Sequence, residues 1–431
     1  MQFLRSAFFG RKIPSLLCGV LCAMAWLPLV AGESREALTA RWAGQILRGL
    51  DAHPRLTASK ALENEALANV DAASQPIYEP YLGMEWKSRG SQSLGSNFEF
   101  FIAQQVDLAG KSAARSKSLE SGSRAVRADR HRIRQDLLQE ILNGASDYWA
   151  ATRVLKISTM RARRIERFVR ILEKNQKAGQ ASQFEVDSGY LRWAEAIGQL
   201  AEAEQLNLQN SFRLRELIGD SRILAHLPSE FLEPLTPITN LAQKVNILPS
   251  VAAARWRFEV KRAEQDAVRA ERTLDPTIGV IAGKDESDNF VGLNVVVPLA
   301  LRSSSKAFHE ASLQSALAEE QRYLESFRHA KVRLENAQAV YRKLFERWRQ
   351  WDSLASSRLQ TREDLLHRLW NAGQISTLDY LAGHEERENA RMNAIQLTAR
   401  VWAAWIEWLA ATGELESWMQ DLAGTKRQWK S

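Results

Sequence analysis

Two long stretches of the chain mix alanine and leucine with glutamate, arginine, glutamine and lysine, and neither contains a proline. One lies between Tyr81 and Pro228, and the other follows Pro298. Proline costs about 3 kcal/mol inside a helix, so both stretches are predicted to be mostly helical. Each has a glycine deep inside it, Gly179 or Gly373. We therefore expect a long helix, a short turn and a second helix in each stretch.

The first long helix is predicted to run from residue 111 to about residue 177. A helix of roughly 65 residues is on the order of 100 Å long, at about 1.5 Å per residue. Helices of this length are stable only when they pack along their length, as in a coiled coil. The pattern indicates an extended helical assembly rather than a globular domain.

Shorter apolar runs predict two β-hairpins, residues 80–106 and 276–298. The second run of each hairpin, 98–106 and 290–298, has the length of about ten residues that a tilted strand needs to cross a bilayer. Aromatic residues crowd the first hairpin, as they do at membrane–water interfaces. The runs would equally suit a soluble sheet with aromatic core residues. Four strands cannot close a barrel, so a membrane barrel would require several copies of the chain.

The two halves of the chain repeat one another. The sequence KAGQASQFE at 177–185 is answered by NAGQISTLD at 371–379, and the order of helix, hairpin, long helix, turn and helix is the same in both halves. Self-similarity of this kind indicates a duplicated architecture. The predicted domains are a first repeat at 33–225, a linker at 226–248, a second repeat at 249–412 and a C-terminal tail at 413–431.

The first 32 residues have the pattern of an export signal. Arg5, Arg11 and Lys12 precede an apolar stretch that ends in small residues. A transmembrane anchor is the alternative, but Pro28 and the small residues after it favour cleavage. Both cysteines lie inside this segment, so the mature chain would have no disulfide.

The net charge gives no reason to expect a nucleic-acid partner. The chain has 58 basic and 51 acidic residues, and without the three basic residues of the signal segment the balance is 55 to 51, or +4. No stretch after the signal approaches the roughly 20 apolar residues of a membrane-spanning helix. A mature protein that crosses a membrane would then need a closed β-barrel.

The sequence shows no pattern of enzyme chemistry. The seven histidines are scattered, none pairs at i, i+4 beside a carboxylate, and no glycine-rich phosphate loop follows a strand. We therefore expect no catalytic residue, no cofactor and no metal site, and each histidine is expected to be a solvated helix residue.

This combination of an export signal, an internal duplication, two short hairpins and two pairs of very long helices resembles the outer-membrane efflux protein family, the TolC-like exit ducts. The resemblance implies a mainly helical fold with a small β part, in which coiled-coil helices form a tunnel. Four strands per chain would join a trimeric transmembrane β-barrel in the outer membrane of a Gram-negative bacterium, with the helices extending into the periplasm. Its implied partners are two further copies of the chain, outer-membrane lipid, a periplasmic adaptor (membrane fusion) protein and an inner-membrane resistance-nodulation-division pump.

The second hairpin looks like that of the outer-membrane components of cobalt–zinc–cadmium (Czc-type) cation efflux systems. Asp275-Pro276 and Val291-Gly292 match that pattern, whereas Leu274, Val296 and Ala300 depart from it. The resemblance implies a passive exit duct for heavy-metal cations. Alternatives are a duct for drugs or other organic compounds, a type I secretion duct, or a periplasmic coiled-coil structural protein that is not a channel.

The glycine turns are the candidate sites, because the resemblance places them at the far periplasmic end of the tunnel. In some family members two aspartates in this segment ring the channel mouth, where carboxylates would attract cations. Asp379 matches the first of these aspartates, whereas Ala382 stands at the position of the second. Alternatively, Asp379 only complements a helix N-terminus. The channel-mouth candidates are Asp379, Glu185 and Asp187. The candidates for turn formation and adaptor docking are Gly179, Gln180, Ser182, Gly373, Gln374 and Ser376.

Overall fold

The computed structural model describes residues 35–88, 96–219, 232–235, 240–285, 288–299 and 305–424. The predicted signal peptide, residues 1–32, lies outside the described residues. The chain divides into two compact units, Met1–Leu38 and Thr39–Ser431. The first unit is described only over the first four residues of α1 (Arg35–Asp51), and all other described helices and strands belong to the second.

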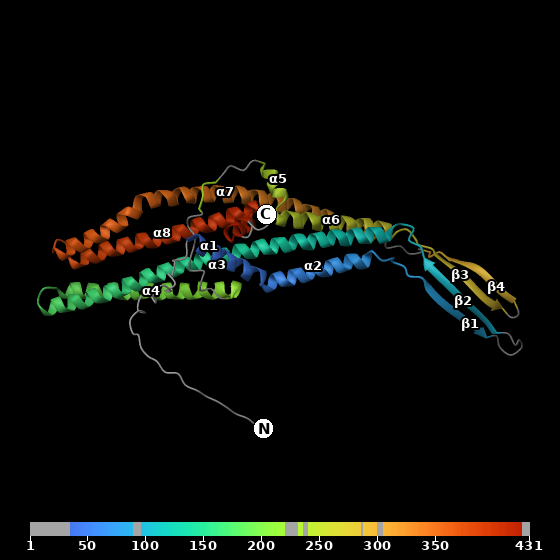
Figure 1. The fold of residues 1–431 in the computed structure, drawn as a ribbon, viewed down its shortest axis with the longest axis horizontal. Helices are drawn as coiled ribbons and strands as arrows, with labels where there is room; N and C mark the ends of the chain where they lie inside the picture. The colour runs from blue at the N-terminus through green and yellow to red at the C-terminus, as the bar shows by residue number, and fades with distance from the viewer. Residues whose placement is uncertain are drawn as a thin grey trace, which may run out of the picture. The chain divides into compact units, whose positions relative to one another are not determined.

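Each half of the second unit contains a short helix, a helix of 67 residues and a helix of 36 residues. They are α2 (Pro54–Ala73), α3 (Lys111–Lys177) and α4 (Gln183–Ile218) in the first half, and α6 (Pro249–Ala270), α7 (Ser305–Asn371) and α8 (Thr377–Thr412) in the second (Figure 1). Two small helices, α5 (Leu241–Asn246) and α9 (Leu415–Leu422), complete the set. The equal lengths confirm that the fold is internally duplicated. Among the described residues, no helix combines the length and apolarity needed to cross a lipid bilayer.

The long helices are held by lengthwise packing. Helix α3 packs against α2, α4, α6 and α8, and α7 packs against α6 and α8. The main core includes residues of α1, α3, α7 and α8, with Trp42, Leu137, Tyr341 and Trp402 almost fully buried. Since isolated helices gain little from propensity alone, this burial supplies most of their stability.

The strands form one antiparallel sheet in the order β1-β2-β3-β4. They are β1 (Tyr81–Ser88), β2 (Ser96–Gln105), β3 (Thr277–Asp285) and β4 (Asp288–Val296). The central pairing of β2 with β3 joins the hairpin of one repeat to that of the other, with Phe101 opposite Ile281. Within the described residues β1 pairs only with β2, and β4 only with β3, so both edges of the sheet are unpaired.

One face of the sheet is almost entirely apolar and exposed. The pairing places the side chains of Leu82, Met84, Trp86, Phe98, Phe100, Ile102, Ile278, Val280, Val291, Leu293 and Val295 on this apolar face. Leu293 is 80% exposed and Leu82 is 78% exposed. The opposite face holds glycine, polar residues and a few aromatic rings; the Phe101 ring lies over Gly83, where a β-carbon would be only 2.2 Å from it. A water-soluble domain rarely leaves so continuous an apolar patch uncovered.

A buried carboxylate, Asp275, joins the sheet to the helices. It precedes β3 and accepts hydrogen bonds from the Tyr78 hydroxyl at 2.7 Å, the Lys111 ammonium at 2.7 Å and the Leu108 amide at 3.2 Å. Burial opposes its ionisation, but Lys111 and Tyr78 outweigh this and hold the pKa of Asp275 below its usual range. The hydrogen bond between Tyr78 and Asp275 raises the pKa of Tyr78 to about 12. Asp275 thereby connects chain segments from both repeats.

Replacing Asp275 with asparagine should lower the free energy of unfolding by about 2 kcal/mol, because Lys111 loses its charged partner while the shape of the site is kept. Thermal unfolding of the purified full-length protein in detergent measures the change. Asp266→Asn is the matched control, because Asp266 forms an exposed ion pair with Lys117 at the longer distance of 3.6 Å. Losing an exposed pair should change stability by less than about 1 kcal/mol. Equal losses in both variants would contradict a special role for Asp275.

Candidate functional site at the helix turns

The two turns between the long helices have the same backbone geometry. Gly179 and Gly373 lie in the left-handed region, with φ of 70° and 67°. In each turn the glycine amide donates to a carbonyl three residues back, and the following glutamine amide donates to one five residues back, at 2.8–3.0 Å. This is the Schellman motif, which ends a helix by satisfying its last carbonyls and favours glycine at the left-handed position. The repeated Ala-Gly-Gln is therefore a helix stop.

The serine and the acid of each repeated segment start the next helix. The Ser182 hydroxyl accepts from the Glu185 amide at 3.2 Å, and the Glu185 carboxylate accepts from the Ser182 amide at 2.8 Å. The Ser376 hydroxyl likewise accepts from the Asp379 amide at 3.1 Å and donates to its carboxylate at 2.7 Å. These contacts form N-caps, with a complete capping box in the first turn. They explain why Ser-x-x-acid recurs.

The structure brings the two turns to the same end of the helices, remote from the sheet (Figure 1). A small apolar cluster behind them joins α3 to α8, in which the Phe168 ring lies 5.2 Å from that of Tyr380. Asp379 and Asp187 are exposed, and Asp187 also accepts a hydrogen bond from Gln183 at 2.8 Å. The predicted mouth and docking residues thus lie at the same end of the helices, with Asp379 and Asp187 accessible there, and their role is a proposal.

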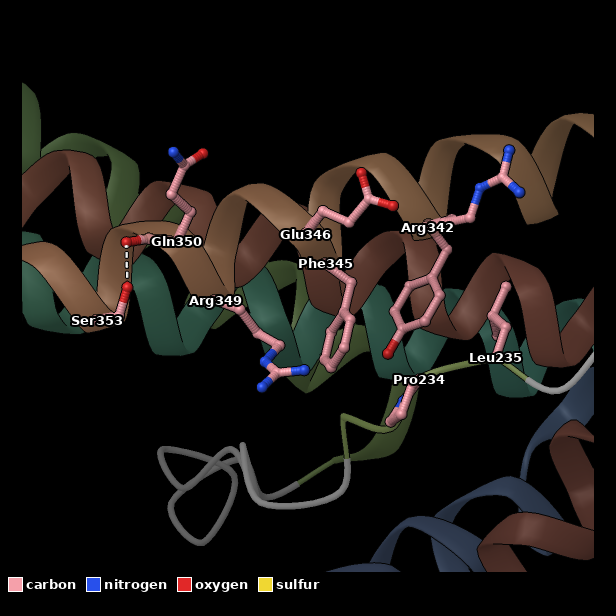
Figure 2. A pocket seen from close by; sticks show the side chains of 9 residues that line it. Pro234, Leu235, Arg342, Phe345, Glu346, Arg349, Gln350 and Ser353 are labelled. Atoms are coloured by element: carbon pink, nitrogen blue, oxygen red, sulfur yellow. Dashed lines mark hydrogen bonds between the residues drawn. The ribbon is translucent and has the colours of Figure 1, made fainter.

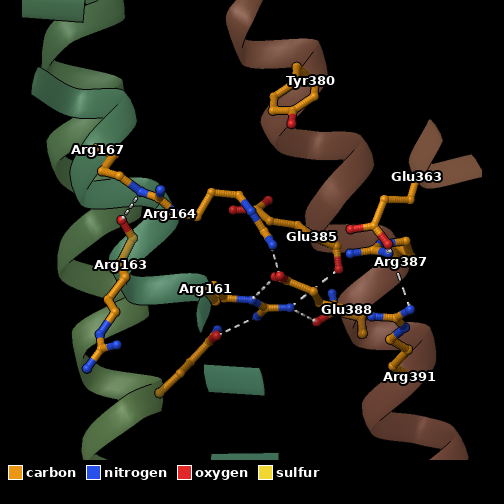
Figure 3. Close-up of polar contacts among 12 residues, drawn as sticks. Arg161, Arg163, Arg164, Arg167, Glu363, Tyr380, Glu385, Arg387, Glu388 and Arg391 are labelled. Carbon is orange, nitrogen blue, oxygen red and sulfur yellow. Dashed lines mark hydrogen bonds and ion pairs between the residues drawn. The ribbon is translucent and has the colours of Figure 1, made fainter. Parts of the chain in front are cut away.

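A buried ion-pair network between α3 and α8 was not predicted (Figure 3). Arg161 on α3 is 5% exposed and donates to the Glu388 carboxylate at 2.9 Å, while Arg164 pairs with the other oxygen of Glu388. Arg161 also donates to Gln199 on α4 at 2.6 Å and to Asn389 at 2.7 Å. The network therefore ties the helix pair of the first repeat to α8 of the second.

Two further ion pairs extend this network to all four helices of the region. Arg387, itself 2% exposed, pairs with Glu363 on α7, and Arg192 on α4 pairs with Glu385 on α8 at 2.7 Å. Each of these charges has helical neighbours that are also charged, so in the sequence they cannot be told from a solvated helix face. Only the pairing of α3 with α8, which local patterns do not encode, makes them interior residues.

The expectation that every histidine is solvated is wrong for His384. This residue is 2% exposed, and within the described residues neither ring nitrogen has a hydrogen-bond partner. Its ring lies 4.4 Å from that of Tyr380 and 5.9 Å from that of His367. Burial, and then the nearby charges of Arg164 and Arg387, lower the pKa of His384 to about 4. His384 is consequently neutral in the folded protein near pH 7.

Acid should therefore lower the stability of the folded protein by protonating His384. In the unfolded chain His384 takes up a proton near pH 6.5, whereas in the folded chain it does so only near pH 4. The contribution of neutral His384 to the free energy of unfolding is therefore complete above pH 6.5 and is lost as the pH falls from 6.5 to 4. The loss expected at pH 4 is on the order of 2 kcal/mol. Thermal unfolding at pH 7.5, 6, 5 and 4 should show this loss in the wild type and a smaller one in His384→Phe. His131→Phe, at an exposed histidine, should behave like the wild type; a wild-type profile in His384→Phe as well would refute the prediction.

In the described part of the chain, no group of three or more histidine, cysteine, aspartate or glutamate side chains is placed to hold a metal ion. What the site offers is helix ends, exposed carboxylates and a seam of ion pairs.

The arrangement of helices and strands is the fold of TolC-like outer-membrane efflux channels. The sequence alone does not reveal this by direct comparison, because it matches no protein-family model and no curated protein. The likeness lies in the order, length and packing of the elements.

Three solved structures illustrate the match. The Campylobacter jejuni CmeC outer membrane channel has a TM-score of 0.71 at 11% identity, over 90% of this chain and 89% of that one. The Neisseria gonorrhoeae MtrE outer membrane channel, in its open state, has a TM-score of 0.71 at 16% identity, over 87% and 90%. CusC, whose crystal structures concern folding and transmembrane channel formation, has a TM-score of 0.69 at 15% identity, over 86% and 91%. At these identities the likeness establishes the fold.

Proposed function

We propose that this chain is one protomer of a passive efflux channel in the outer membrane of a Gram-negative bacterium. The observation that carries the proposal is the exposed apolar face of the sheet, beside helices of 67 residues. A lipid-facing position accounts for that face, and helices of about 100 Å can extend from it through the periplasm. A periplasmic stalk or tether would have no use for such a sheet.

The two unpaired sheet edges support a trimer. Because β1 and β4 each lack a second neighbour in the described chain, an isolated sheet would present open edges. Three copies would pool twelve strands, enough to close a barrel and to pair every edge. Such an exit duct would take cargo from an inner-membrane resistance-nodulation-division pump through a periplasmic adaptor protein. The duct itself catalyses no reaction, and the pump supplies the energy.

The turns are proposed as the tunnel mouth and the adaptor-docking surface. Three copies of Asp379 around one axis would concentrate cations there, with Glu185 and Asp187 as further candidates. Asp379→Asn removes the charge but keeps an oxygen for Ser376, whereas Ser376→Ala removes the cap and keeps the charge. A mouth role predicts that only Asp379→Asn lowers cation selectivity in bilayer recordings. Unchanged selectivity would leave Asp379 as a helix-capping residue.

For the cargo we propose heavy-metal cations, supported by the Czc-like residues Asp275-Pro276 and Val291-Gly292. Because the Asp275 side chain is fully buried at the junction with the helices, this motif marks kinship rather than a cargo-binding site. Deleting the gene and measuring growth with zinc, cadmium, cobalt, nickel, copper, silver and lipophilic drugs tests the assignment. Sensitivity confined to one or a few metals, restored by the intact gene, is expected. Sensitivity to drugs alone would keep the channel and replace the metal cargo with organic compounds.

A further inference from the structure

A cavity of about 550 Å³ lies beside the middle of α7 (Figure 2). One wall is α7 from Tyr341 to Ser353, and the other is Pro234 and Leu235 of the inter-repeat segment. The cavity has the size typical of a ligand pocket. None of the features considered above accounts for it.

The floor of this α7 pocket is aromatic and well ordered by its contacts. Tyr341 is fully buried, and its hydroxyl donates to the backbone carbonyl of Glu233 at 2.8 Å. The Phe345 ring stacks on the Tyr341 ring at 5.5 Å with an interplanar angle of 25°. The hydrogen bond holds the described residues 232–235 against α7, so this wall of the pocket is in place before anything enters. A preformed pocket loses little entropy when it is filled.

Two arginines and one glutamate line the pocket and give its rim a net positive charge. Figure 2 shows Arg349 extending beside Phe345 toward Pro234, with Arg342 at the opposite end. Both are exposed, and neither has a hydrogen-bond or ion-pair partner in the described residues. Glu346 is the one carboxylate among the described residues that line the pocket, and it pairs with Lys343 at 3.7 Å rather than with either arginine. Arginine and aromatic residues are enriched in binding hot spots, and guanidinium groups match carboxylates in pairs of hydrogen bonds.

We propose that the α7 pocket binds an acidic segment of a partner protein. An apolar or aromatic side chain of that segment lies on Phe345 between α7 and Pro234, and flanking carboxylates pair with Arg342 and Arg349. The charge of the rim selects an acidic partner, and the open, elongated shape of a pocket along one helix suits a chain segment. That the partner is periplasmic rests on the proposed function; the binding itself does not.

Selection of twelve-residue peptides from a random display library on the purified full-length protein tests the proposal. Enrichment of peptides with aspartate or glutamate next to phenylalanine, leucine or tryptophan is expected. The selected peptide should bind about tenfold more weakly to Arg342→Glu/Arg349→Glu, and its asparagine and glutamine counterpart should bind the wild type equally weakly.

Arg328→Glu/Lys331→Glu is the matched control. It makes the same change of charge on the same helix, at residues that do not line the pocket, and should weaken binding by less than about threefold. Circular dichroism verifies that both double variants are folded. The proposal is overturned if no acidic peptide is enriched, or if the control weakens binding as much as the pocket variant. Channel conductance is measured separately, so failure here leaves the channel proposal intact.

Discussion

Replacing Leu293 with arginine is expected to keep the protein out of the outer membrane. Leu293 lies in the middle of β4 and is 80% exposed on the apolar face of the sheet. Arginine on the lipid face of a membrane barrel costs about 2–4 kcal/mol at the bilayer midplane, and a trimer would carry that cost three times. The amount of heat-sensitive trimer in outer-membrane fractions, seen on gels with and without boiling, should fall close to zero.

Asn294→Arg is the matched control for this substitution. Asn294 is the next residue along β4, and its side chain points to the opposite face of the sheet. The same residue introduced there should leave trimer in the membrane fraction near the wild-type amount. Equal loss in both variants would point to a general folding defect, and equal tolerance would contradict a lipid-facing sheet.

Replacing Glu388 with leucine should cost about 3–5 kcal/mol of stability. Glu388 is 4% exposed and pairs with both Arg161 and Arg164. Its removal leaves the buried Arg161 charge without its carboxylate, and charges buried without compensation are expensive. Thermal unfolding and limited proteolysis of the purified protein should show a loosened contact between α3 and α8.

Glu386→Leu serves as the control, because Glu386 is an exposed residue of the same helix that pairs with Arg362. It should change stability by less than about 1 kcal/mol. The double variant Arg161→Met/Glu388→Leu should regain part of the loss, since it also removes the buried Arg161 charge, while Arg164 still lacks its carboxylate partner. If Glu388→Leu were as stable as Glu386→Leu, the network would be peripheral to the seam.

What the sequence predicted well was local. The absence of proline predicted the 67-residue helices, and the first was expected to within a residue or so of its observed bounds, Lys111–Lys177. The Ala-Gly-Gln and Ser-x-x-acid segments encode a helix stop and a helix start within a few residues, so both turns could be predicted from the local sequence. The fold could be inferred for the same reason, since it depends on the order and lengths of elements.

What the sequence could not predict depends on contacts between distant segments. The pairing of β2 with β3 and of α3 with α8 brings together residues more than 150 positions apart. Arg161 and His384 therefore looked like ordinary charged-face residues until their helix partners were known. Asp275 was recognised as part of a motif, but its buried contacts with Tyr78 and Lys111 come from the fold.

Single-channel recording of the purified full-length protein in a planar lipid bilayer tests directly whether this chain forms a conducting pore. Uniform, stepwise increases of current are expected as trimers insert, and none are expected from Leu293→Arg. Heat-sensitive trimers that reach the outer membrane but never give stepwise currents, at any voltage, would contradict an efflux channel and favour a structural role for the helices.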